Sequence, residues 1–168
     1  YADPFFSTNG KFIRLEALNK KNGIGDILEV DFEDINRQRI ILNGNHFSYP
    51  HSVIYNKNEY LIPEVGSHSS QIIYSLNSDI ETNKILKGLE NKKIVDATLY
   101  QKDNYWYLFF GFKENSLNVL NLWISKDLSN TFKPHPCSPI NISTTARMGG
   151  NITYINNKIL RFGQNNEN

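Results

Sequence analysis

Cysteine is almost absent from this sequence, and its scarcity excludes two classes of small-domain architecture. Cys137 is the only cysteine among 168 residues. One cysteine excludes an intrachain disulfide framework and a zinc site built on several thiolates. We expect Cys137 to be a small buried or loop thiol rather than a nucleophile.

An excess of charge of one sign and a long apolar run are also missing. The 18 Lys and Arg residues nearly balance the 17 Asp and Glu residues, for a formal net charge of +1. The sequence therefore has no broad basic field for nucleic acid and no acidic tail. No apolar run approaches the roughly 20 residues of a membrane-spanning helix. No signal peptide is evident, and we expect a cytoplasmic protein.

What the sequence does contain is a recurring unit of two short apolar strands around a polar turn. The clearest example runs over residues 96–111, and similar stretches begin near residues 3, 49 and 149. These starting points lie about 46 to 53 residues apart, a period typical of β-propellers and other repeat arrays. Asn9-Gly10 marks the first turn, because this dipeptide favours a tight hairpin.

Each repeat predicts a meander of strands, and no helix is expected. Turn residues recur every ~8 to 12 positions between segments rich in Val, Ile, Tyr and Phe, a pattern of all-β proteins. Residues 77–89 have some helical spacing, but their β-branched and Asn content favours loop and strand. We predict an all-β, five-bladed β-propeller of which about three and a half blades are present. The expected blades are 1–45, 46–92, 93–140 and a partial blade 141–168.

Several short motifs follow one another in a fixed order along the chain. They are Asp3-Pro4-Phe5, His46 to Pro50, Ile62-Pro63-Glu64, Asp96 to Tyr100, Pro134-His135-Pro136 and Ala146-Arg147. This order resembles the five-bladed propeller at the N-terminus of glucosamine inositolphosphorylceramide transferases, and it is more distantly similar to family 43 glycoside hydrolases. A similar module occurs in bacterial proteins of sugar metabolism. The resemblance implies a propeller that handles carbohydrate.

Asp3, Asp96 and Arg147 are the first candidate site residues. The repeat predicts that they line the central channel of the propeller, although an Asp at a strand entry also serves as a turn cap. The resemblance to family 43 hydrolases implies Asp3 as the base and Asp96 as the residue that tunes pKa. Arg147 stands where that family has its acidic Glu, and a guanidinium cannot donate a proton at neutral pH. Arg147 either binds an anionic group or pairs with Asp3 or Asp96.

Four further residues are candidate ligand contacts. Tyr49 is expected either to stack on a sugar or to pack at a blade junction, and His46 and His51 lie close to it in sequence. Glu64 is a candidate substitute for the absent acid. No spacing of His and carboxylate residues suits a metal, so no metal or other cofactor is expected.

Three functions remain open from the sequence. The first is a non-catalytic module that binds carbohydrate or a sugar nucleotide and serves a fused or associated transferase. The second is a glycoside hydrolase that uses Asp3 as base with an unidentified general acid. The third is a platform that binds only proteins. Whether the chain is itself an enzyme is left open, and neither nucleic acid nor a membrane span is an expected partner.

Overall fold

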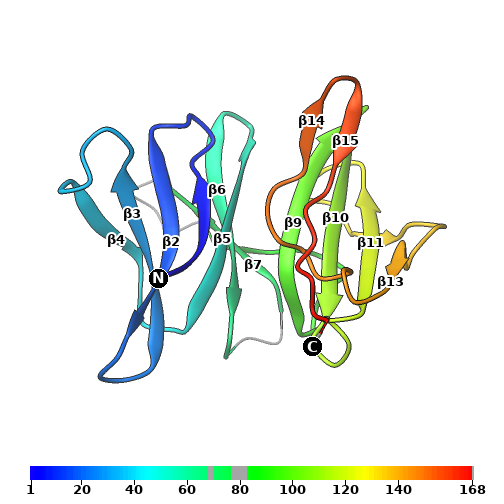
Figure 1. The fold of residues 1–168 in the computed structure, drawn as a ribbon. Coiled ribbons are helices and arrows are strands. Elements are labelled where there is room, and N and C mark those ends of the chain that lie inside the picture. Colours follow the sequence, from blue (N-terminus) through cyan, green and yellow to red (C-terminus); the bar gives the residue numbers. More distant parts are fainter. Residues whose placement is uncertain (68–69, 77–82, 168) are drawn as a thin grey trace. The chain divides into compact units, whose positions relative to one another are not determined.

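The computed structural model describes residues 1–67, 70–76 and 83–167, and these residues form an all-β structure without helices (Figure 1). The all-β prediction is confirmed. The chain divides into two compact units. The first unit comprises Tyr1–His68 and Ile73–Asn83, and the second comprises Ser69–Ile72 and Lys84–Asn168.

The first unit begins with a four-stranded antiparallel sheet in the order β1-β2-β3-β4. Asn9-Gly10 closes the first hairpin as predicted, because Gly10 takes a left-handed φ of 72° and the Asn9 carboxamide oxygen accepts the Ser7 hydroxyl and the Lys11 amide. The strands are β1 (Ala2–Phe6), β2 (Phe12–Asn19), β3 (Ile24–Asp31) and β4 (Gln38–Leu42).

A second meander completes the first unit. Strands β5 (Phe47–Tyr55) and β6 (Asn58–Val65) form a hairpin whose turn residues, Asn56 and Lys57, both have left-handed φ angles, as a two-residue type I′ turn requires. Strand β7 (Ile72–Ser75), whose residues 73–75 belong to this unit, pairs with β6. The core between the two meanders is apolar and includes Ile27, Phe47, Leu61, Ile62 and Ile73.

The second unit is organised around β9 (Ile94–Lys102), β10 (Tyr105–Phe112) and β11 (Val119–Ser125). Two short strands, β12 (Lys133–Pro134) and β13 (Asn141–Ile142), both pair with β11. Along β10, Trp106, Leu108 and Phe110 alternate onto one fully buried face, where Phe110 meets Trp123 edge to face at 5.6 Å between ring centroids. This aromatic packing forms the core of the second unit.

Three short elements complete the second unit. Strand β8 is Lys84–Ile85, and β14 (Thr153–Ile155) forms a hairpin with β15 (Lys158–Leu160). Strand β8 lies within residues 77–89, where loop and strand were expected, and the β14–β15 hairpin lies in the stretch that begins near residue 149. Strand β13 was not predicted. Residues 77–82 of the predicted loop-and-strand region lie outside the described residues. Cys137 is an exposed thiol in the loop between β12 and β13.

Candidate functional site at the strand bulges

The same backbone irregularity occurs at three of the positions that the sequence repeat marked. Asp3, Tyr49 and Asp96 have left-handed φ angles of 50°, 50° and 52°. Each residue lies in the first strand of its meander, at the point where pairing with the next strand shifts register. The shift lies between Ala2 and Phe5 in β1 and between Ser48 and His51 in β5. For β9, the shift occurs where this strand pairs with Phe109 and Gly111 of β10.

The left-handed backbone at these three bulges lowers the stability of the fold. A residue with a Cβ atom pays roughly 1–2 kcal/mol to adopt the left-handed region. Tyr49 is an unusual occupant, since Asp and Asn adopt this region more readily than aromatic residues do. Bulges of this kind redirect a side chain and occur often beside ligand sites. The repeated bulge therefore marks one structural position on three successive meanders.

In the first unit, the β1 and β5 bulges are joined by an aromatic contact. The Tyr49 ring is 1% exposed and packs edge to face against Phe5, with 4.7 Å between ring centroids. His51 is buried beside the same Phe5 ring, at 6.0 Å. Asp3 itself is half-buried, and its carboxylate has no hydrogen-bond or ion-pair partner among the described residues. The structure thus brings Tyr49 and His51 together around Phe5, next to the Asp3 bulge.

His46 and Glu64 lie elsewhere in the first unit. The His46 Nδ1 atom accepts the Gly25 amide at 3.0 Å, and its Nε2 atom lies 3.7 Å from a carboxylate oxygen of Glu16. These contacts tie the loop before β5 to β2 and β3. Glu64, near the end of β6, is half-buried and pairs in register with Ser48, one residue before the Tyr49 bulge.

In the second unit, Arg147 contacts the Asp96 bulge directly. Arg147 Nε donates to Asp96 Oδ2 at 2.6 Å, and Nη2 reaches Oδ1 at 3.4 Å. The Asp96 side chain is 3% exposed and that of Arg147 is 33% exposed, so the carboxylate is covered while the guanidinium reaches the surface. Of the two pairings expected for Arg147, the structure contains the one with Asp96.

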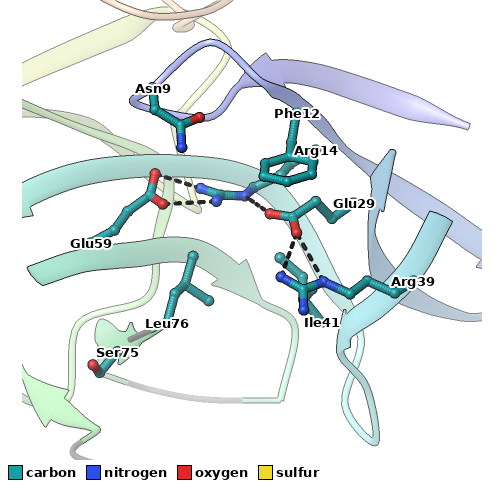
Figure 2. Close-up of a pocket in the computed structure, with 9 residues that line it drawn as sticks. All are labelled: Asn9, Phe12, Arg14, Glu29, Arg39, Ile41, Glu59, Ser75 and Leu76. Atoms are coloured by element: carbon teal, nitrogen blue, oxygen red, sulfur yellow. Dashed lines mark hydrogen bonds and ion pairs between the residues drawn. The ribbon is translucent and has the colours of Figure 1, made fainter. Parts of the chain in front are cut away.

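A second charged cluster, which the sequence did not single out, crosses the first sheet. Arg14, Glu29 and Arg39 stand opposite one another on β2, β3 and β4, so that positive and negative side chains alternate across the strands. Arg14 Nε donates to Glu29 at 2.8 Å, while Nη1 and Nη2 of Arg14 donate to the two oxygens of Glu59 on β6. Figure 2 shows this chain of ion pairs from Glu59 through Arg14 and Glu29 to Arg39.

The chemistry of this cluster keeps its buried members ionised. Burial opposes ionisation of Glu59, but hydrogen bonds from Arg14 and from the Thr8 amide and hydroxyl outweigh it and lower its pKa from 4.5 to about 2. Burial likewise opposes the charge of Arg14, yet the carboxylates of Glu59 and Glu29 raise its pKa above the ordinary value. Glu59 also connects the two meanders of the first unit, because Thr8 and Arg14 belong to the first and Glu59 to the second.

Comparison with known proteins gives the family of the chain. The family model described as glucosamine inositolphosphorylceramide transferase 1, N-terminal, matches residues 2–168. The chain belongs to this family. Among curated proteins, glucosamine inositolphosphorylceramide transferase 1 of Arabidopsis thaliana is 29% identical over 128 residues, and the protein of the same name from Oryza sativa subsp. japonica is 27% identical over 128 residues.

This member of the transferase N-terminal family corresponds to a small part of those relatives. The matched region is 71% of this chain but only 16% of the Arabidopsis protein and 17% of the rice protein. The expected relation to the N-terminal domains of these transferases is therefore confirmed, as is the association of this domain type with a glycan-transferring enzyme.

Two further findings concern the described part of this family member. Within residues 1–67, 70–76 and 83–167, no group of three His, Cys, Asp or Glu side chains is arranged to hold a metal ion. No helix of the same residues is long and apolar enough to cross a membrane.

The buried charges that sequence reasoning missed did leave a signal. Arg14 and Glu29 interrupt the apolar strands 12–15 and 27–30 at positions whose direct neighbours are apolar. A charge in such a strand indicates either a solvent-facing position or a buried partner, and only the tertiary structure distinguishes the two.

Proposed function

We propose that this chain is a module that binds carbohydrate or a sugar nucleotide and serves a glycan-transferring enzyme, without glycosidase activity of its own. The observation that carries the proposal is the repeated left-handed bulge at Asp3, Tyr49 and Asp96. Backbone strain at three equivalent positions lowers the stability of the fold. Residues with such strain gather at ligand sites.

The proposed architecture is a five-bladed propeller whose first strands surround a central channel. The four-stranded β1-β2-β3-β4 meander and the ladder of β9 to β12 have the strand order of blades, and the β14–β15 hairpin has the order of the first half of one. The proposed blades remain 1–45, 46–92, 93–140 and 141–168. In this arrangement Asp3, Tyr49, Asp96 and Arg147 stand around the channel, and His46, His51 and Glu64 support the loops beside it.

The pairing of Asp96 with Arg147 supports binding rather than hydrolysis. Arg147 donates a hydrogen bond to the Asp96 carboxylate at 2.6 Å, so the partner of this carboxylate is a cation and not a second acid. Inverting and retaining glycosidases both need a second carboxyl group that donates a proton. Arg147 cannot fill that role, but its guanidinium, on a side chain that is 33% exposed, suits the phosphates of a sugar nucleotide or the carboxylate of an acidic sugar.

The alternative function is a glycoside hydrolase in which Asp3 activates water. It is favoured by the Asp3 carboxylate, which has no partner among the described residues. The general acid of this reaction is unidentified, with Glu64 as the candidate. Both functions are proposed for the chain alone, since the transfer named for its relatives belongs to much longer proteins.

Titration separates the two functions. We expect saturable binding of UDP-glucose, UDP-N-acetylglucosamine or an arrayed glycan to the 168-residue chain by calorimetry, with at least tenfold weaker affinity in Asp96→Asn. Asp103→Asn is the matched control, because exposed Asp103 also has a left-handed φ of 50° but occupies the β9–β10 turn.

Two results would contradict the binding module. One is the absence of binding across nucleotide sugars and the glycan array. The other is turnover of aryl glycosides that disappears in Asp3→Asn, which would support the hydrolase instead.

A further inference from the structure

A cavity of about 380 Å³ opens beside the charged row of the first sheet, away from the strand bulges (Figure 2). Its size is within the range of small-molecule pockets. It lies wholly within the first unit, between the first sheet and the end of β7. It is lined by Asn9, Phe12, Arg14, Glu29, Arg39, Ile41, Glu59, Ser75 and Leu76.

The net charge of the cavity wall is zero. Its two arginines and two glutamates pair with one another, so the wall offers no net attraction to an ion. The carboxylates are also heavily occupied. Glu59 Oε1 accepts hydrogen bonds from Thr8, Arg14 and Ser52, and Glu29 Oε1 accepts two from Arg39.

The hydrogen-bonding capacity that remains consists mainly of donors. Arg39 uses Nε and Nη2 on Glu29, and its Nη1 has no acceptor among the described residues. Arg14 uses four of its five N–H groups within the part of the chain that the structure describes. The Asn9 carboxamide nitrogen, which points toward the row in Figure 2, also has no acceptor in that part. Such a wall favours a ligand rich in acceptor oxygens.

Apolar side chains complete the lining. Phe12, Ile41 and Leu76 are half-buried and contribute apolar surface next to the polar row. A combination of fixed donors with apolar surface matches a sugar ring, which has hydroxyl oxygens at its rim and C–H groups on its faces. An inorganic anion would use the donors but leave the apolar surface unoccupied.

We propose that this cavity is a second ligand site, which binds one ring of a neutral sugar through Asn9, Arg14 and Arg39 with Phe12 beneath the ring. The inference does not depend on the proposed function of the bulges, because it uses different residues and a different cavity. It adds a neutral-sugar site to a protein whose bulge site is proposed for glycans or sugar nucleotides.

Nuclear magnetic resonance on the 168-residue chain tests this site directly. The probes are the methyl glycosides of glucose, galactose, mannose and N-acetylglucosamine, with inorganic phosphate as the anionic comparison. We expect at least one glycoside to cause saturable shifts in the backbone amides of Phe12 and Arg14, in the Asn9 carboxamide and in the Nε–H signal of Arg14. Inorganic phosphate should cause no saturable shift at these groups.

Matched arginine variants give the second readout. Arg39→Gln should weaken glycoside binding about fivefold or more, the loss expected from one or two hydrogen bonds. Arg37→Gln should leave binding unchanged, since exposed Arg37 lies two residues away and pairs with Asp34 outside the cavity. A native pattern of amide signals in both variants shows that the fold is intact.

Three outcomes would overturn the proposal. They are no saturable shift at Asn9, Phe12 or Arg14 with any glycoside, saturable shifts with phosphate alone, or equal weakening by Arg39→Gln and Arg37→Gln. Loss of nucleotide-sugar binding in Asp96→Asn tests the bulge site independently, so either site can fail without the other.

Discussion

Asp3 and Asp96 adopt almost the same left-handed backbone conformation, with φ angles of 50° and 52°, although 92 residues separate them in the chain. Both lie in the first strand of a meander, at a shift in pairing register. Their surroundings nevertheless differ. Asp96 is buried against Arg147, whereas Asp3 is half-buried without a partner among the described residues. The same backbone conformation therefore presents a carboxylate paired with a cation at Asp96 and a carboxylate without a partner among the described residues at Asp3.

If the Asp3 bulge serves a ligand, its strain should be removable at no cost to stability. Glycine adopts the left-handed region without a steric penalty, so Asp3→Gly should retain or raise the free energy of unfolding by up to about 1 kcal/mol. Asp3→Ala should lower it by about 1 kcal/mol, because alanine keeps the Cβ atom and adopts the left-handed region less readily than Asp does. Urea unfolding measures both variants.

Ala2→Gly is the matched control for the Asp3 series. Ala2 is exposed, and its φ is not left-handed, so glycine there should cost about 0.5 to 1 kcal/mol. Equal effects of glycine at residues 2 and 3 would contradict the interpretation of the bulge as a strained position.

The Asp96–Arg147 ion pair should contribute much more to stability than an exposed pair does. Arg147→Met removes a cation from a carboxylate that is 3% exposed, and we expect a loss of about 3 kcal/mol in the unfolding free energy. Arg147→Lys should cost less, since it keeps the charge but not the two-point geometry.

Lys102→Met is the control for the ion pair within the same unit. Lys102 lies 3.9 Å from Asp103, and both side chains are largely exposed, so the expected loss is at most about 0.5 kcal/mol. Similar losses for Arg147→Met and Lys102→Met in urea unfolding would show that Asp96 does not depend on the guanidinium.

Glu59 should make the stability of the first unit depend on acid. Its pKa falls from 4.5 to about 2 on folding, so its contribution is fully present above about pH 4.5. The contribution is lost as the pH falls toward 2, and the loss attributable to this group is about 2 to 3 kcal/mol. Urea unfolding at pH 5, 4 and 3 measures the slope.

Glu59→Gln should be less stable at pH 5 and should have a flatter dependence on pH than the unaltered chain. Glu33→Gln is the control, because exposed Glu33 accepts no side-chain hydrogen bond among the described residues. Parallel pH profiles for the unaltered chain and Glu59→Gln would rule out Glu59 as the source of the acid sensitivity.

Local sequence signals predicted many of the strands, because hairpins depend on neighbouring residues. Asn9-Gly10 predicted the first turn, and the two-strand unit over residues 96–111 predicted β9 and β10. Strand β13 was not predicted, because two residues carry no periodicity and their pairing with β11 depends on a distant partner. The relation to the transferase N-terminal family followed from the order of several short motifs.

The sequence predicted which residues belong to the candidate site but not their conformation. The repeat marked Asp3, Tyr49 and Asp96, but no pattern indicated that all three have left-handed backbones. The burial of the Tyr49 ring against Phe5 also required the structure, since period-two alternation breaks at a bulge.

The sequence by itself determined the all-β class, the repeated meanders and the family, because these follow from local propensity, turn residues and motif order. Only the tertiary structure decided which charges meet. Arg14 and Glu59 are 45 residues apart and Asp96 and Arg147 are 51 apart. Such pairs form only when packing excludes water between segments that no local pattern connects.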